Sequence, residues 1–238
     1  MHAGIQISSF RPLMTDLPGL ERVLSFMRRI GCEYTQLQWI DRRIRPRDVA
    51  CALDRYGIKA LGVQDKARAV FDDPEYYLEL CRVTKAGDLC VSGAGETGTD
   101  TLLKGLDSIR AASGNTSLTF SFHPTGGDFE EALDSVMRQS GALRLTLDVC
   151  QAHDAGRSVR DIIRRYAGRI EMVHFKDRAA DGALCPVGNG VIDFEEAALA
   201  CSEAGVGTLL AEQETWNDAF CDVGLGFEYT RKLAAKYI

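Results

Sequence analysis

The chain has 238 residues, and 28 Lys and Arg against 34 Asp and Glu give it a net charge of −6 at pH 7. With 45% hydrophobic and 26% charged residues it has an ordinary globular composition, which excludes disordered, collagen-like and coiled-coil chains. The acidic balance argues against nucleic acid as a partner, because basic side chains supply most of the affinity for phosphates. The sequence has no apolar run of about 18 residues, and its eight cysteines lack C-x-x-C spacing. We therefore expect a reduced, cytoplasmic protein that does not enter a membrane.

Strand-like apolar stretches alternate with stretches of helical periodicity from the first residues onward. In the first three units each helix has a recognisable start, either an acidic cap or a proline in its first turn. The units are a strand at 4–8 with a helix capped by Asp16 and ended by Gly31, a strand at 34–40 with a helix from Pro46 to Gly57, and a strand at 58–63 with a helix capped by Asp73.

Five further strand-like stretches continue this alternation, each followed by a helical stretch. Two of those helices begin with capping-box spacing, Ser158 with Asp161 and Asp193 with Glu196. No linker interrupts the pattern, so residues 1–238 are expected to form a single domain. About eight β/α units predict a single (β/α)8 TIM barrel of class α/β, with an open doubly wound sheet as the alternative. The five strands are expected at 89–92, 117–122, 143–149, 170–175 and 208–213.

Residues able to bind a divalent cation stand at matched positions on the last four expected strands. Barrel closure would bring these strand ends together at the mouth where barrel enzymes form their active sites. Two imidazoles and two carboxylates suit Mn²⁺, Co²⁺, Zn²⁺ or Fe²⁺ better than Ca²⁺ or Mg²⁺. A single His or carboxylate at a strand end is more often a core residue or a helix cap. The prediction of a metal site therefore depends on the occurrence of such residues on four successive strands. The expected ligands are His123, Asp148, His174 and Glu212.

Three segments of the carboxyl-terminal half carry a resemblance to a known family. They are residues 147–156, the stretch 169–177 with the pattern R-I-x-x-V-H-F-K-D, and the stretch 186–194 with G-x-G-x-x-D-F. Together with the Gly-Ile-Gln-Ile opening strand, they resemble the xylose isomerase-like TIM-barrel superfamily. Its members include sugar phosphate isomerases/epimerases, inosose dehydratases and hydroxypyruvate isomerases.

The resemblance implies a divalent-metal cofactor (Mn, Co, Zn, Fe or Mg) and a sugar, ketose or polyol substrate. The metal site of the family maps onto the four expected ligands. The metal would polarise a carbonyl, and a base would remove the neighbouring proton to give an enediolate-type intermediate, as in an isomerase or epimerase. The alternatives are an inosose dehydratase-like lyase and a non-catalytic barrel that binds metal or carbohydrate.

Charged residues beside the expected ligands are candidates for catalysis. Glu212 is a ligand that could also act as a base, and Glu214 could be a free base, although a solvated carboxylate is an equal alternative. Lys176 could contact substrate oxygens or phosphate and assist catalysis. Asp177 is as well suited to bracing a neighbouring loop.

Several positions depart from the family pattern. His123 stands where the family's epimerases carry a glutamate acid/base, and Gln64 and Gln151 stand where histidines are frequent. Glutamine can hydrogen-bond a hydroxyl but cannot transfer protons near neutral pH, so both are expected to bind substrate. Trp39 and Trp216 could stack on a sugar ring, although packing is the simpler role. The departures at His123, Gln64 and Gln151 are the observations that motivate the binding-only alternative.

Two expectations concern partners. A related branch cleaves DNA at abasic sites, but the acidic charge argues against that activity here. The chain is short for a barrel, for which roughly 250 residues are typical, so we expect an open site and a possible homodimer.

Overall fold

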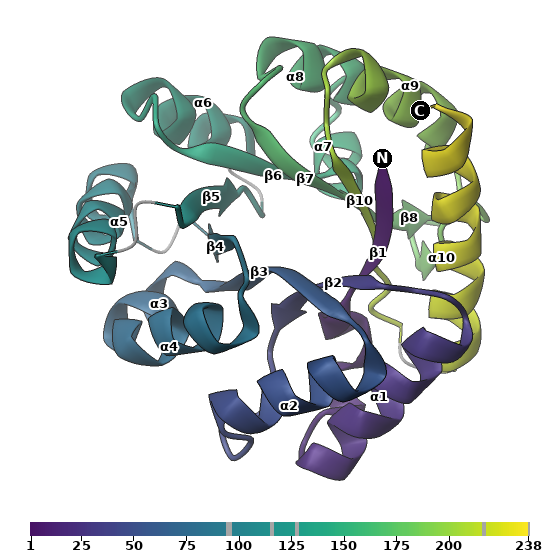
Figure 1. Ribbon diagram of the computed structural model, residues 1–238. Helices are drawn as coiled ribbons and strands as arrows, with labels where there is room; N and C mark the ends of the chain where they lie inside the picture. Colours follow the sequence, from purple (N-terminus) through teal and green to yellow (C-terminus); the bar gives the residue numbers. More distant parts are fainter. Residues whose placement is uncertain (94–96, 115–116, 127–128, 216–217, 238) are drawn as a thin grey trace.

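Eight parallel strands close into a barrel that helices surround (Figure 1). The computed structural model describes residues 1–93, 97–114, 117–126, 129–215 and 218–237. The first strand pairs with both the second and the last, which closes the sheet. The predicted (β/α)8 TIM barrel is therefore confirmed, and the open-sheet alternative is wrong. The barrel strands are β1 (His2–Gln6), β2 (Tyr34–Gln38), β3 (Lys59–Lys66), β4 (Asp88–Ser92), β5 (Thr119–His123), β6 (Arg144–Asp148), β7 (Ile170–Phe175) and β10 (Thr208–Ala211).

Helices form the connections between successive strands, as parallel pairing requires. Two helices follow β3 and two follow β6. The helices are α1 (Leu17–Arg29), α2 (Pro46–Tyr56), α3 (Ala67–Asp72), α4 (Pro74–Thr84), α5 (Thr99–Ser113), α6 (Phe129–Gln139), α7 (Val149–Asp154), α8 (Val159–Arg165), α9 (Phe194–Glu203) and α10 (Ala219–Lys236).

The side chains expected to cap helices do so. The carboxylate of Asp16 accepts a hydrogen bond from the Gly19 N–H at 2.8 Å. Asp73, Ser158 and Asp193 each accept one from the amide three residues further along the chain. These bonds satisfy N–H groups that the first helical turn leaves unpaired, so local sequence is enough to place these helix starts.

The chain departs from the expected strands at its beginning and after β7. The strand expected at 4–8 ends at Gln6, and a 3-10 helix, η1 (Ile7–Leu13), follows it. Pro12 lies in this stretch and has no N–H to donate to a sheet. After β7 the chain forms a small antiparallel hairpin outside the barrel, too short for periodicity to predict. Its strands are β8 (Asp177–Arg178) and β9 (Leu184–Cys185).

The structure can be compared with two expectations from the sequence, that the cysteines are unpaired and that no segment enters a membrane. All eight cysteines are free, in agreement with their unpaired spacing, and five of them are buried. A buried free thiol packs as a small apolar residue. Among the described helices, none combines the length and apolar character that crossing a membrane requires.

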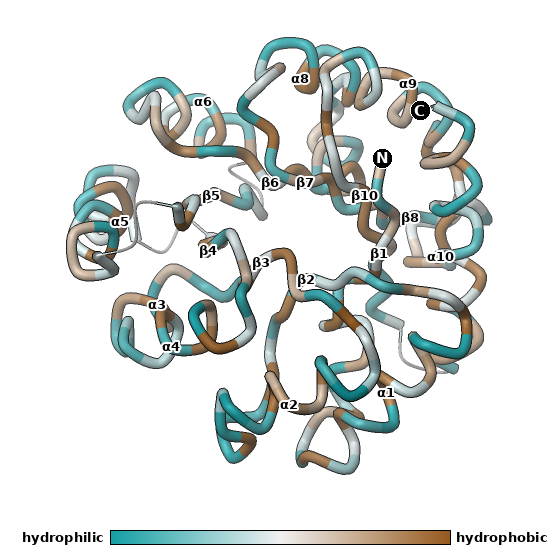
Figure 2. The backbone as a smooth tube through the Cα atoms, viewed as in Figure 1, coloured by the Kyte–Doolittle hydropathy of each residue, from teal (hydrophilic) through white to brown (hydrophobic). Residues whose placement is uncertain are grey.

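Along the barrel strands, apolar side chains face the helices, and many of the side chains that face the lumen are polar. On β5, Phe120 and Phe122 belong to the hydrophobic core, whereas Ser121 between them donates to Asp88 at 2.6 Å and lies 3.0 Å from the Thr146 hydroxyl. Figure 2 shows hydrophobic colour along β6 and β7 and hydrophilic colour on many outer turns of the helices. Barrel lumens are usually filled by Val, Ile and Leu. In this barrel, polar side chains such as Ser121 and Thr146 occupy part of the lumen below the mouth.

Asp88 is a fully buried carboxyl group at the amino end of β4, the end of the barrel away from the expected site. It accepts hydrogen bonds from the hydroxyls of Thr119 at 2.9 Å and Ser121 at 2.6 Å. Burial, with a smaller contribution from the charge of Glu171, raises the pKa of Asp88 to about 7 against these hydrogen bonds. The lumen thus contains an ionisable group that is not at its mouth.

Candidate functional site

The ends of four neighbouring strands place the expected metal ligands at the carboxyl mouth of the barrel. His123 and Asp148 are the last residues of β5 and β6. His174 is the next-to-last residue of β7 and pairs in register with Asp148. Glu212 follows β10 directly, and its N–H donates to the Phe175 carbonyl at 2.9 Å. All four expected ligands are at most 5% exposed, so closure and register bring them to one level of the lumen.

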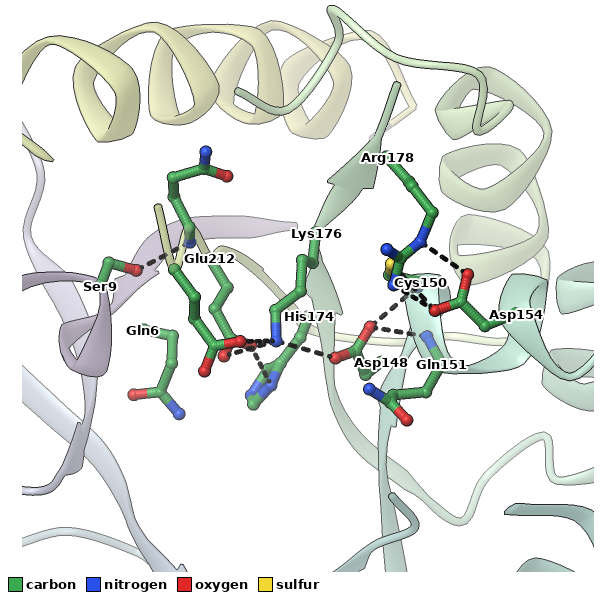
Figure 3. A network of polar contacts seen from close by, with 12 residues as sticks. Gln6, Ser9, Asp148, Cys150, Gln151, Asp154, His174, Lys176, Arg178 and Glu212 are labelled. Carbon is green, nitrogen blue, oxygen red and sulfur yellow. Dashed lines mark hydrogen bonds and ion pairs between the residues drawn. The ribbon is translucent and has the colours of Figure 1, made fainter. Parts of the chain in front are cut away.

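These side chains face one another across the mouth. His174 Nδ1 lies 3.0 Å from Glu212 Oε2, and the ring centroids of His123 and His174 are 5.0 Å apart. The Lys176 ammonium lies between two carboxylates, with Nζ 3.4 Å from Asp148 Oδ2 and 3.1 Å from Glu212 Oε1 (Figure 3). The candidate site is therefore a buried cluster of two imidazoles, two carboxylates and one ammonium.

Lys176 also donates to the partly exposed carboxylate of Glu214, at 2.9 Å. Burial opposes the charge of Lys176, but Glu212, Asp148 and Glu214 hold the pKa of the ammonium well above its ordinary value. Burial likewise opposes the charge of Glu212, yet Lys176 and His174 hold the pKa of this carboxyl well below its usual range. Burial raises the pKa of Asp148, although Lys176 opposes this. Three carboxylates share one ammonium, so negative charge is in excess at the mouth.

One expected ligand has a buried atom without a polar partner in the described part of the chain, namely His123 Nδ1. The corresponding atoms of the other three are paired, with His174 Nδ1 3.0 Å from Glu212 Oε2 and Asp148 Oδ2 3.4 Å from Lys176 Nζ. Buried polar atoms are nearly always partnered, so the His123 nitrogen calls for an explanation. Two nitrogen and two oxygen donors beside excess negative charge fit a divalent cation. Within the described ranges, no three His, Cys, Asp or Glu side chains are already grouped as metal ligands, and the Lys176 ammonium lies between the carboxylates instead.

The protonation of His123 and the two oxygens of Asp148 agree with a ligand role. Burial, together with His174, lowers the pKa of His123 to about 3, so its imidazole is neutral and has a free lone pair near neutral pH. Asp148 Oδ1 accepts hydrogen bonds from the N–H groups of Cys150 at 2.8 Å and Gln151 at 3.1 Å, which caps α7. This cap fixes the carboxylate and turns Oδ2 towards Lys176.

The residues expected to bind substrate occupy different parts of the mouth. Gln64 Oε1 accepts from Gln6 Nε2 at 3.4 Å inside the lumen. Gln151 Oε1 accepts from the Gly126 N–H at 3.1 Å and so joins α7 to the loop after β5. Trp39 follows β2 with a left-handed φ of 54°, and the Arg11 guanidinium lies 4.5 Å from the centre of its ring. Trp216 lies outside the described residues.

Sequence reasoning missed two lumen glutamines that contact the site. Gln36 Oε1 lies 2.8 Å from His174 Nε2 and also accepts from Gln6 Nε2 at 2.7 Å. Both glutamines are fully buried. The sequence contains a signal for them, since Gln36 and Gln38 alternate along β2 and Gln6 ends β1. Amide side chains on the inner face of a barrel need hydrogen-bond partners there, so this pattern predicts contacts among polar groups in the lumen.

Asp177 organises the loop that carries the G-x-G-x-x-D-F motif. Its Oδ2 accepts from the N–H groups of Gly188 at 2.9 Å and Gly190 at 2.8 Å, and its Oδ1 accepts from Arg178 N–H at 2.8 Å. A Cβ on Gly190 would lie 2.3 Å from the Arg178 carbonyl oxygen, so only glycine fits there. The most specific motif of the sequence therefore contributes a braced loop beside the site, as one reading of Asp177 expected.

No protein-family model and no curated protein matches the sequence, but solved structures match the fold. An L-ribulose 3-epimerase has a TM-score of 0.79 at 15% identity, covering 100% of this chain and 96% of that one. The IOLI protein, with a bound zinc atom, has a TM-score of 0.76 at 13% identity, covering 100% and 99%. A xylose isomerase domain protein from Alicyclobacillus acidocaldarius has a TM-score of 0.70 at 16% identity, covering 91% and 93%. The resemblance to xylose isomerase-like barrels is thus confirmed at the level of the fold.

Proposed function

We propose that this protein is a divalent-metal-dependent isomerase or epimerase of a sugar, ketose or polyol. The observation that carries the proposal is the buried cluster at the carboxyl mouth, in which His123 Nδ1 has no polar partner among the described residues. The cluster consists of His123, Asp148, His174 and Glu212. The sugar-epimerase and zinc-binding neighbours of the same fold support it. These four residues would hold the metal.

A divalent cation bound there supplies Lewis acidity, which polarises a substrate carbonyl and acidifies the neighbouring C–H. Glu214 is our candidate base, because its side chain is 25% exposed and can reach a substrate above the mouth. Lys176 Nζ, 2.9 Å from Glu214 Oε2, orients this carboxylate and can stabilise negative charge that develops on a substrate oxygen. Gln64, Gln151 and Trp39 are proposed to bind the rest of the substrate.

Of the three carboxylates that contact Lys176 in the described part of the chain, only Glu214 is appreciably exposed, and this favours one reaction type within the class. In the family that the sequence resembles, epimerases carry a second acid/base carboxylate where this chain has His123. A single base can take a proton from one carbon and return it to the next, which interconverts a ketose and an aldose. We therefore propose isomerisation ahead of two-base epimerisation.

Two measurements test the proposal. Metal analysis of the purified protein should give one divalent ion per chain, and Asp148→Ala with His174→Ala should lose it. Incubation with ketoses and inososes in deuterated water should give metal-dependent exchange of the proton beside the carbonyl. Glu214→Gln is the matched variant, since it should keep the metal and lose the exchange. A protein without bound metal, whose carbohydrate turnover survives Asp148→Ala and His174→Ala, would contradict the proposal.

A non-catalytic binding barrel is the second candidate. Gln64 and Gln151 favour it, because an amide cannot transfer protons near neutral pH. Both amides are instead engaged in hydrogen bonds, Gln64 with Gln6 and Gln151 with the Gly126 N–H. Stoichiometric metal and saturable carbohydrate binding without any proton exchange would establish this candidate. Release of water from an inosose would instead establish the dehydratase alternative.

A further inference from the structure

The mouth of the barrel has two unlike halves. The proposed metal ligands stand on or directly after β5, β6, β7 and β10, whereas every buried polar side chain that the structure describes on β1, β2 and β3 is uncharged. Four glutamines lie on these three strands, and we call them the amide arc. They are Gln6, Gln36, Gln38 and Gln64, and each is at most 5% exposed.

The amide arc belongs to the same lumen as the proposed metal ligands. Gln36 pairs in register with Gln6, and Gln38 pairs with Gln64. Gln36 Oε1 lies 2.7 Å from Gln6 Nε2 and 2.8 Å from His174 Nε2, so the arc reaches the candidate metal centre. Gln38 follows Gln36 by two residues on β2, and the alternation of a strand turns it to the same face, nearer the carboxyl mouth.

Three amides of the arc each have one buried atom without a hydrogen-bond partner among the described residues. The atoms are Gln6 Oε1, Gln36 Nε2 and Gln38 Oε1. Buried polar atoms are nearly always partnered, so these amides call for a ligand that supplies both donors and acceptors. A hydroxyl group can donate and accept, and it can therefore satisfy an amide in either orientation.

Charge decides which part of a substrate suits the amide arc. A phosphate or carboxylate group would enter this half of the lumen without a countercharge among its described buried side chains. It would also meet the excess negative charge at the mouth, where three carboxylates share the Lys176 ammonium. Hydroxyl groups meet neither cost, so the arc favours the uncharged part of a sugar or polyol.

We propose that the amide arc binds the hydroxyl-bearing end of an unphosphorylated sugar or polyol, with Gln38 as the residue that determines specificity for it. The placement of the other end of the substrate at a metal rests on the proposed function. The contact between Gln38 and a hydroxyl group does not, and it can be measured without a metal.

Arg11 offers the contrary possibility of a phosphorylated substrate. Its exposed guanidinium lies 4.5 Å from the centre of the Trp39 ring, at the rim of the mouth above the arc. Arginine is well suited to phosphate, so a terminal phosphate ester would be bound at this rim instead. The first test therefore sets free sugars against their phosphate esters.

The first test is calorimetric titration of the full-length protein, once in EDTA and once with Zn²⁺. The probes are D-fructose, D-psicose, D-ribulose and myo-inositol, each beside its monophosphate ester. We expect at least one free compound to bind about 10-fold or more tightly than its ester. Binding of no free compound, or equal or tighter binding of every ester, would overturn the inference.

The second test replaces Gln38 with Met. Binding of the preferred free compound should weaken by about 3- to 10-fold, the effect of one lost neutral hydrogen bond. One monodeoxy form of that compound should bind the wild type more weakly than the parent compound but bind Gln38→Met equally well. Leu37→Met is the matched control, because Leu37 belongs to the hydrophobic core behind β2. Equal losses in the two variants, or a deoxy series that ranks alike in wild type and Gln38→Met, would contradict the role of Gln38.

Thermal unfolding in EDTA without sugar distinguishes binding from a structural role. Gln38 Oε1 has no partner among the described residues to lose, so Gln38→Met should melt no lower than Leu37→Met. A Tm more than about 4 °C below this control, the scale of one lost structural hydrogen bond, would assign Gln38 a structural role and overturn the inference.

These measurements separate the inference from the proposed function. A protein that binds a free sugar through Gln38 in EDTA but takes up no Zn²⁺ contradicts the proposed function and supports the amide arc as a binding site. A protein that binds Zn²⁺ and prefers the phosphate esters contradicts the role of the arc and leaves the proposed function standing.

Discussion

Replacing Lys176 with Met removes the one ammonium that three carboxylates share at the mouth of the barrel. Methionine keeps most of the length of the side chain, so the change is mainly one of charge. The lysine side chain is 8% exposed, and Asp148 and Glu212 are at most 6% exposed, so solvent screens their interaction little. The carboxylates of the variant would face one another without a neutralising cation.

The expected loss of stability follows from this burial. Removing one partner of a buried ion pair costs about 3–5 kcal/mol, because the remaining charge is left uncompensated. For a chain of this size, 1 kcal/mol corresponds to roughly 2–4 °C in Tm. We therefore expect the metal-free Lys176→Met variant to melt roughly 6–20 °C below the metal-free wild type.

Thermal unfolding in excess EDTA measures this difference. Lys236→Met is the matched control, since Lys236 pairs with Glu195 at 2.7 Å but both side chains are about half exposed. Exposed pairs contribute about 0–1 kcal/mol, so this variant should melt close to the wild type. A Lys176→Met protein that melts within about 2 °C of its control would refute the reasoning.

Adding a divalent cation extends the same prediction. A metal bound among the carboxylates would replace the missing positive charge, and saturation at about 1,000 times Kd stabilises a folded protein by about 4 kcal/mol. We expect Mn²⁺ or Zn²⁺ to raise the Tm of Lys176→Met by more than that of the wild type. Equal shifts for the two proteins would show that Lys176 and the metal do not share a site.

Three substitutions away from the ligands test the rest of the structure. The native state holds the proton of Asp88 more tightly than the unfolded chain, with a pKa of about 7 against 3.8, so stability should fall by on the order of 4 kcal/mol as the pH rises from about 4 to 7. In urea unfolding across this range, Asp88→Asn should flatten the decline, and an unchanged slope would contradict the assignment. Asp177→Ala should cost about 3 kcal/mol in urea unfolding, because the amides of Gly188 and Gly190 lose their acceptor; a cost under about 0.5 kcal/mol would show that the brace is dispensable. Gly190→Ala should cost about 1–3 kcal/mol in the same assay, through contact with the Arg178 carbonyl, and unchanged stability would mean that the loop yields freely.

Much of the fold and the positions of the expected ligands could be predicted because they depend on local patterns. Asp16, Asp73, Ser158 and Asp193 satisfy amides only three residues away, so each helix start is encoded where it occurs. The alternation of strands and helices leaves parallel pairing as the arrangement that buries both, and the ends of parallel strands meet at one edge. This placed all four expected ligands at the mouth without knowledge of any contact between them.

The sequence by itself therefore determined the succession of elements and which residues stand at the strand ends, while the contacts among those residues depended on closure of the barrel. His174 and Gln36 are 138 residues apart, and their hydrogen bond exists because register and alternation turn both into one lumen. The place of the Lys176 ammonium between Asp148 and Glu212 is set in the same way, since the neighbours of a side chain depend on strands distant in sequence. Local sequence fixes where a side chain stands along its strand, and only the tertiary structure decides what it meets across the barrel.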